Sequence, residues 1–242
     1  MRADRLLVAR GLVPSRTQAQ EAIESGRVFS AGRAVARAAE TLPEDAPLEV
    51  RPPAHPYVSR GGVKLAHALD HFGIDPDGAV ALDLGASTGG FTDVLLRRGA
   101  RRVYAVDVGH GQLAPEIRND PRVIALEGVN ARYLTSADIP DPIDLIVCDV
   151  SFISLTLVLP PALDLVRPGS CLVALIKPQF EAGPGGVGKG GIVRDPAVRD
   201  AARAKIADWL AAQPGWAVEG TVESPIAGGD GNREFLLAAR RA

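Results

Sequence analysis

The sequence predicts an α/β protein with a doubly wound, mainly parallel sheet, helices on both faces, and a smaller α+β unit in front of it. Apolar strands alternate with helical segments between residues 79 and 176, as is typical of parallel sheets. Two strand patterns at 216–224 and 233–239 predict an antiparallel hairpin at the edge of that sheet. With 242 residues, 46% hydrophobic and 23% charged, the chain can bury a sizeable core.

Residues 1–51 predict a small basic α+β unit. Apolar positions have helical spacing at 3–11 and 15–25, with Ser15 placed to cap the second helix and Gly26 to end it. Two short strand patterns surround residues 30–32, and a third lies at 48–50. Residues 1–37 contain seven arginines and three acids, although the whole chain has a net charge of −2. Arginines spread over a compact unit suit contact with nucleic-acid phosphates, and the alternative is a solvated charged face; the candidates are Arg5, Arg10, Arg16, Arg27 and Arg33.

Residues 52–59 predict a stiff linker, because the stretch RPPAHPYVS contains three prolines and no periodic pattern. The second domain then covers 60–242 and opens with a helix at 61–72. Its strands are expected at 79–84, 102–108, 123–126, 143–150 and 171–176, and its further helices at 89–98, 112–119, 155–166 and 196–212.

A glycine-rich loop closes the first strand of this domain and opens the next helix. Its pattern, DLGASTGGF, differs from the G-x-G-x-x-G of dinucleotide folds and lets bare backbone approach a ligand. At the end of the following strand, Asp107 lies where a carboxylate can accept both hydroxyls of an adenosine ribose. The glycine-rich loop and Asp107 together indicate a binding site for S-adenosylmethionine. The alternative is a tight turn that happens to lie beside a surface aspartate. The candidate cofactor residues are Asp83, Gly85, Ser87, Thr88, Gly89, Gly90, Phe91, Asp107 and Asn130, the last of which could cap the adenine.

Charged side chains at further strand ends are candidates for the chemistry. Asp149 ends the apolar strand LIVCDV without the N/D-P-P-Y pattern of amino-group methylation, and no Pro-Cys pair of pyrimidine C5 methylation is present. The acceptor is therefore expected to be an oxygen. Of 27 basic residues only four are lysines, and Lys177 follows a strand while Lys64 lies near the start of a helix. Glu234 precedes the last strand and is a further candidate. The alternative to a catalytic role is an ordinary charge pair with Arg233 at the edge of the sheet.

These motifs resemble the TlyA family of S4-domain rRNA methyltransferases, historically called haemolysins, within the FtsJ-like superfamily. The resemblance covers the whole chain and is carried by VSRGGVKL, DLGASTGGFTDVLL, VDVGHGQL, DVSFISL, IKPQFE and NREFLL. It implies a Rossmann-like class I methyltransferase fold behind an S4-like RNA-binding domain. It also implies a catalytic tetrad at Lys64, Asp149, Lys177 and Glu234, acting on the ribose 2′-hydroxyl of a cytidine.

The implied substrate is ribosomal RNA or a ribosomal subunit. Family members modify the large-subunit RNA alone or both subunits, and the short termini here favour the large subunit. Which lysine takes the proton, and the oligomeric state, stay open. The alternatives are a non-catalytic RNA-binding protein, an S4-domain pseudouridine synthase and a membrane-active haemolysin.

Composition argues for a cytoplasmic protein without membrane or metal partners. The first residues carry charges throughout, no later stretch approaches the roughly 20 apolar residues of a membrane span, and CxxC and HExxH patterns are missing. Cys148 and Cys171 lie in apolar runs and are expected as buried thiols.

Overall fold

The computed structural model describes residues 1–52, 55–183 and 185–242. The chain divides into two compact units, Met1–Pro56 and Tyr57–Ala242. Pro53 and Ala54, in the middle of the predicted linker 52–59, lie outside the described residues.

The first unit packs two helices on a small antiparallel sheet with strand order β2-β1-β3. Ser15 Oγ accepts a hydrogen bond from Gln18 N, which confirms the predicted cap of the second helix. Asp4 is fully buried, and both Arg2 and Arg16 pair with its carboxylate. The elements are α1 (Ala3–Ala9), α2 (Arg16–Glu24), β1 (Val28–Ser30), β2 (Arg33–Ala34) and β3 (Leu48–Val50).

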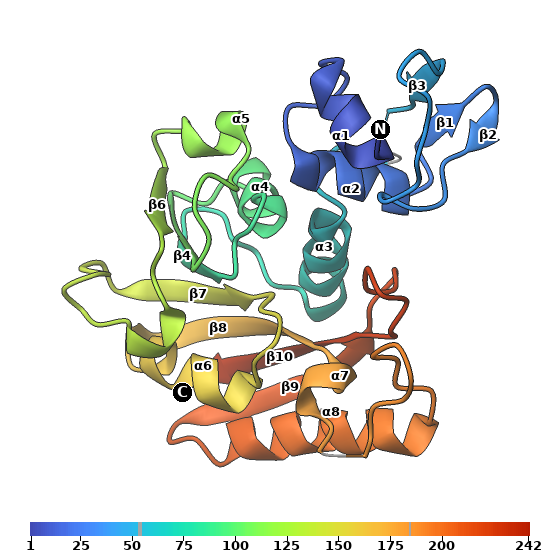
Figure 1. Cartoon of the computed structure of the whole chain (residues 1–242). Helices are drawn as coiled ribbons and strands as arrows, with labels where there is room; N and C mark the ends of the chain where they lie inside the picture. The colour runs from blue at the N-terminus through green and yellow to red at the C-terminus, as the bar shows by residue number, and fades with distance from the viewer. Residues whose placement is uncertain (53–54, 184) are drawn as a thin grey trace. The chain divides into compact units, whose positions relative to one another are not determined.

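The second unit is built on a seven-stranded sheet of order β6-β5-β4-β7-β8-β10-β9 (Figure 1). Strand β10 runs antiparallel to both of its neighbours, β8 and β9, whereas β4 to β8 pair in parallel, so the predicted fold class is confirmed. The strands are β4 (Val80–Leu84), β5 (Arg102–Asp107), β6 (Val123–Glu127), β7 (Ile143–Cys148), β8 (Val166–Ile176), β9 (Trp216–Glu223) and β10 (Phe235–Arg241). The helices are α3 (Gly61–Phe72), α4 (Gly90–Arg97), α5 (Pro115–Arg118), the 3-10 turn η1 (Ala131–Tyr133), α6 (Leu155–Leu163), α7 (Pro178–Glu181) and α8 (Pro196–Ala211).

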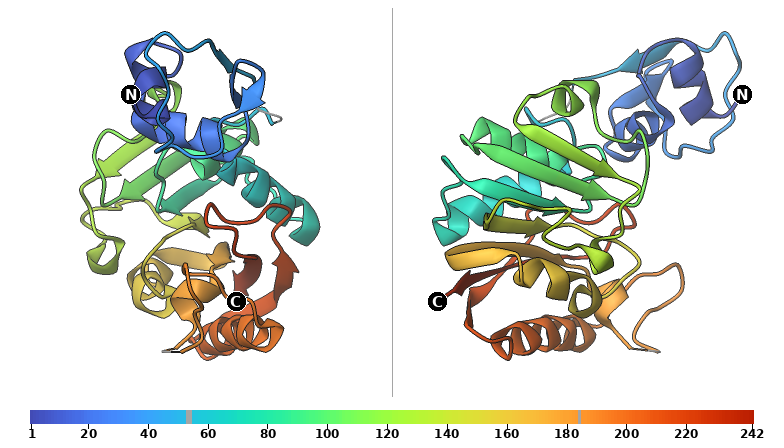
Figure 2. Two further views of the ribbon diagram at one scale, coloured as in Figure 1. Left: turned by 45° about the vertical axis from the view of Figure 1, so that its right-hand side comes forward. Right: turned by 90° about the vertical axis from the view of Figure 1, so that its left-hand side faces the viewer.

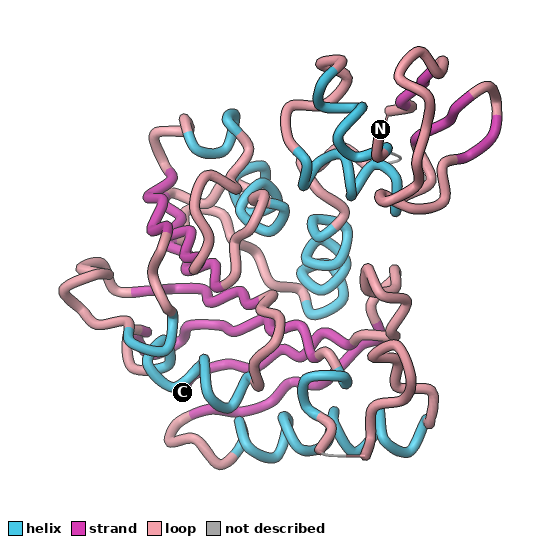
Figure 3. Tube along the Cα trace, viewed as in Figure 1, coloured by secondary structure: helices cyan, strands magenta, loops and turns pink. Residues whose placement is uncertain are grey.

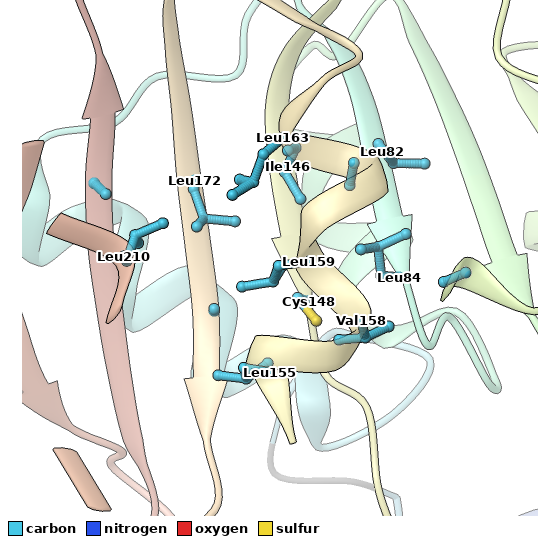
Figure 4. Packing of buried hydrophobic residues seen from close by; sticks show 14 of the residues in the cluster. Leu82, Leu84, Ile146, Cys148, Leu155, Val158, Leu159, Leu163, Leu172 and Leu210 are labelled. Atoms are coloured by element: carbon cyan, nitrogen blue, oxygen red, sulfur yellow. The ribbon is translucent and has the colours of Figure 1, made fainter. Parts of the chain in front are cut away.

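Two apolar clusters cover the two faces of this sheet. Helices α3, α4 and α5 contribute to one cluster, and α6 and α8 contribute to the other. In Figure 4, α6 residues such as Leu155 and Leu159 lie against Ile146 and Cys148 of β7. Helix α8 packs along β9 at the edge of the sheet (Figure 2). Among the described residues, every helix is too short or too polar to cross a bilayer.

Several boundaries differ from the sequence prediction. Strand β8 begins at Val166 rather than 171, because Arg167, Pro168 and Gly169 interrupt the apolar run without ending the strand, although Gly169 has φ +84°. Helix α6 correspondingly ends at Leu163. The short helices η1 and α7 were not predicted, since three or four residues show no periodicity.

Candidate active site

The carboxyl ends of the parallel strands lead into loops that carry the candidate residues (Figure 3). Asp149 directly follows β7 and Lys177 directly follows β8. Because β10 runs antiparallel, its first residue, Phe235, pairs with Ile176, the last residue of β8. Glu234, one position earlier, therefore reaches the same edge of the sheet as Lys177. The structure thus gathers chain segments separated by as many as 170 residues.

The four charged side chains form two ion pairs. Lys64 Nζ from α3 pairs with Glu234 Oε2, and Lys177 Nζ lies 2.7 Å from Asp149 Oδ1. The first pair is enclosed, with side chains 7% and 3% exposed, whereas Lys177 and Asp149 are 11% and 21% exposed. The second pair is therefore the more accessible of the two. Glu234 does not pair with Arg233, which binds Glu223 instead.

The charges of the two pairs act on one another. Burial works to raise the pKa of Asp149, but the positive charges of Lys177 and Lys64 hold it below its ordinary value. Burial raises the pKa of Glu234, although the Lys64 ammonium opposes that shift. Asp149 is therefore a stable carboxylate at neutral pH, placed to orient Lys177.

A cleft of about 490 Å³ lies beside Asp149, within the size range of small-molecule sites. It opens at the ends of β4, β5 and β7 and extends to the segment after β6. Its polar lining includes Ser87, Asp107, Gln112, Asn130 and Asp149, and its apolar lining includes Val108, Val129, Val150, Phe152 and Ile153.

The lining fits a nucleoside. Asp107 uses one oxygen to accept from Ser87 N at 2.9 Å and the other to accept from Gly109 N at 2.7 Å. A carboxylate offers about four acceptor positions, so two stay open to ribose hydroxyls. Gly85 has φ +82°, and a Cβ there would lie 2.7 Å from the Asp149 carbonyl oxygen. Only glycine lets this turn pass so close to the strand that carries Asp149.

Four of the predicted cofactor residues line the cleft, namely Gly85, Ser87, Asp107 and Asn130. The Asn130 side chain also accepts from Arg132 N and caps η1. Thr88, Gly89, Gly90 and Phe91 instead belong to the turn and the first residues of α4, and Phe91 is buried in the core.

Asp83 lies beneath the loop rather than in the cleft. Its carboxyl is fully buried, and its Oδ2 accepts from Thr92 Oγ1 at 2.6 Å. Burial raises the pKa of Asp83 to about 7, and the negative charges of Asp149 and Asp107 add to that shift. Asp83 therefore supports the glycine-rich loop from the core, through its hydrogen bond with Thr92.

Sequence reasoning missed Ser151 and Gln112. Ser151 lines the cleft and accepts a hydrogen bond from Lys177 Nζ at 2.8 Å. Its position two residues after Asp149 was an available signal, because alternate residues of an extended segment share a side. Gln112 comes from a loop, where spacing carries no such signal; its Oε1 lies 3.3 Å from Ser87 Oγ.

Most of the candidate arginines of the first unit also make contacts within it. Arg16 binds the buried Asp4, Arg10 donates to Ala46 O, and Arg33 pairs with Glu40. Arg27 donates to Ser25 Oγ. Arg5 is exposed.

Comparison with known proteins gives the family. Residues 57–241 match the FtsJ-like methyltransferase family, and residues 1–46 match the S4 domain. A protein of Mycobacterium tuberculosis named 16S/23S rRNA (cytidine-2′-O)-methyltransferase TlyA is 47% identical, over 99% of this chain and 89% of its own. Hemolysin A of Brachyspira hyodysenteriae is 43% identical, over 98% of both chains.

A solved structure of a Lactococcus lactis protein superposes on this chain with a TM-score of 0.74. The two are 48% identical, and the match covers 77% of this chain and 89% of the other. The paired lysines and acids, the cleft at the strand ends and these matches agree with the resemblance drawn from the motifs. The chain therefore belongs to the TlyA family of rRNA methyltransferases, which join an S4 domain to an FtsJ-like, S-adenosylmethionine-dependent methyltransferase domain.

Proposed function

We propose that this protein transfers a methyl group from S-adenosylmethionine to the ribose 2′-hydroxyl of a cytidine in ribosomal RNA. The observation that carries the proposal is the convergence of the Lys64–Glu234 and Lys177–Asp149 pairs beside a nucleoside-sized cleft. The name of the Mycobacterium tuberculosis relative supports the cytidine and the 2′-oxygen.

The tetrad supplies what a ribose hydroxyl needs in order to react. Such a hydroxyl is a weak acid, so it requires a nearby proton acceptor and positive charge for the developing oxyanion. Bound S-adenosylmethionine supplies an electrophilic methyl group. We assign proton acceptance to the neutral form of Lys177, which is the more accessible lysine, and charge stabilisation to the enclosed Lys64 ammonium. Asp149 and Glu234 orient the two amines.

We propose that Gly85, Ser87, Asp107 and Asn130 hold the nucleoside part of the cofactor. The two open acceptor positions of Asp107 and the bare backbone of Gly85 support this assignment. Asp83, Thr88, Gly89, Gly90 and Phe91 would act indirectly, by holding the shape of the loop.

We propose residues 1–51 as the RNA-binding domain, 52–59 as the linker and 60–242 as the catalytic domain. Arg5, Arg10, Arg16, Arg27 and Arg33 would contact phosphates. The S4 match supports the RNA-binding role. A ribosomal substrate also implies action in the cytoplasm.

The test is transfer of labelled methyl from S-adenosylmethionine to rRNA and to purified ribosomal subunits, followed by mapping of the modified nucleotide. We expect 2′-O-methylcytidine in the 23S RNA. The same product in 16S RNA would extend the substrate to both subunits, as the name of the Mycobacterium tuberculosis relative states for that protein. Methylation of a base nitrogen or carbon would contradict the assigned chemistry.

A further inference from the structure

A serine hydroxyl completes the surroundings of the Lys177 amine. Lys177 Nζ donates to Ser151 Oγ at 2.8 Å and lies 2.7 Å from Asp149 Oδ1. An ammonium has three N–H donors, and a neutral amine has two donors and one lone pair. Ser151 Oγ thus fills one of these positions through a hydrogen bond, whereas Asp149 Oδ1 contacts the amine as an ion pair without hydrogen-bond geometry. The other positions hold protons in the charged form and include the lone pair in the neutral form.

We propose that Ser151 is a positioning residue for Lys177. Its hydrogen bond, together with the ion pair to Asp149, fixes the rotation of the amine, so that a remaining position meets the hydroxyl of the acceptor ribose. With Asp149 as the only partner, the amine could turn about its Cε–Nζ bond and present a donor or the lone pair in several directions. This inference rests on the proposed function, because the ribose hydroxyl is the group to be met.

The segment that carries Ser151 is held firmly at its first residue. Asp149 N donates to Leu84 O at 2.9 Å, and Gly85 packs against the Asp149 carbonyl so closely that no Cβ would fit. Phe152, directly after Ser151, has φ +66°, a conformation that costs energy in a residue other than glycine. The chain therefore turns sharply at this point.

The other end of the segment is held by a buried carboxylate. Glu181 accepts from Ser154 Oγ at 2.6 Å and from Leu155 N at 2.7 Å, and Lys205 Nζ lies 3.0 Å from Glu181 Oε2. Residues 149–154 are thus fixed at both ends. A serine presented from a fixed segment can orient an amine with little loss of conformational entropy on substrate binding.

The first experiment compares the steady-state kinetics of methyl transfer to rRNA for the wild type, Ser151→Ala and Ser151→Thr. We expect Ser151→Ala to lower kcat roughly 10- to 100-fold, as loss of a hydrogen bond to a charged group does, with little change in either KM. Threonine keeps the hydroxyl and should restore most of kcat. The matched control is Ser136→Ala at an exposed loop serine, for which we expect wild-type kinetics.

A double-mutant cycle separates positioning from a general structural role. In the Lys177→Met background no amine remains to be oriented, so Ser151→Ala should cause no further loss. An equal loss in both backgrounds, or wild-type kcat in Ser151→Ala, would overturn the inference. Binding of S-adenosylmethionine by each variant, measured by calorimetry, shows that the cleft is intact.

The scarcity of lysine provides a readout that is independent of activity. Protein labelled with [6-13C]lysine gives signals from four lysines only, Lys64, Lys177, Lys189 and Lys205. Ser151→Ala should move the Lys177 signal and leave those of Lys189 and Lys205 in place; an unmoved Lys177 signal would contradict the contact. If the wild type methylates no rRNA, the proposed function fails, and this comparison still decides whether Ser151 holds Lys177.

Discussion

The Lys64–Glu234 pair couples the proposed chemistry to the stability of the fold. Both side chains are buried, so removal of either leaves an uncompensated charge away from water. We expect Glu234→Ala to lower the free energy of unfolding by about 3–5 kcal/mol, as measured by urea denaturation. A loss of activity in Glu234→Ala would then have two causes, the lower stability of the fold and the absence of the carboxylate from the proposed tetrad.

The double variant Lys64→Met with Glu234→Leu separates those causes. Apolar side chains of similar size should restore most of the stability, because no charge stays buried. Methyl transfer should remain lost. Wild-type transfer by the double variant would remove this pair from the catalytic assignment.

Asp83 gives the protein a predictable dependence of stability on pH. Its pKa of about 7 in the fold exceeds the ordinary 3.8, so between these values the folded state keeps a proton that the unfolded state releases. The free energy of unfolding should fall as pH rises through this window, by up to about 4 kcal/mol from this group, and should level off above pH 7. Asp83→Asn, which cannot titrate, should gain stability relative to the wild type as pH rises. Parallel urea-denaturation results at pH 4.5, 6 and 8 would contradict this.

At the scale of elements, the turn between β4 and α4 brings the lining of the cleft against the backbone of Asp149. We expect Gly85→Ala to weaken S-adenosylmethionine binding more than tenfold by calorimetry, since its Cβ would push against Asp149 O. The backbone conformation alone costs about 1–2 kcal/mol in a residue with a Cβ. Gly78→Ala is the matched control: Gly78 has φ +67° with nothing within 4 Å of the added Cβ. Equal affinities in the two variants would show that the close approach of Gly85 to Asp149 does not govern cofactor binding.

The alternation of strand and helix patterns, with turn residues between them, was enough to predict the sheet and its longer helices, but not η1, α7 or the start of β8. Strand ends that carry Asp149 and Lys177 placed the candidate residues at one edge, because parallel strands finish on the same side. The partners could not be predicted. Lys64 meets Glu234 because β10 inserts between β8 and β9, a choice of neighbour that local periodicity does not encode. Burial also keeps Asp83 and Phe91 in the interior and out of the cleft lining, although they belong to the same motif as Gly85.

At the scale of the whole molecule, the division into two units predicts separable binding activities. The second unit contains the cleft, both ion pairs and two apolar clusters of its own. Deletion of residues 1–50 should therefore keep S-adenosylmethionine affinity, measured by calorimetry, and lower rRNA affinity, measured by filter binding. In the full chain, Arg5→Ala should reduce the salt dependence of RNA binding by about one phosphate contact. Unchanged RNA affinity after the deletion would show that the candidate arginines of the first unit form a solvated charged face and do not bind RNA.

Strand β10 and the glutamate before it come after every other element of the sheet in chain order. During synthesis, the cleft, both lysines and Asp149 leave the ribosomal exit tunnel before Glu234 does. Until β10 is in place, no strand joins β8 to β9 and Lys64 lacks its carboxylate. If the proposed tetrad is correct, a nascent chain gains the ability to modify RNA only when this last strand brings Glu234 to Lys64.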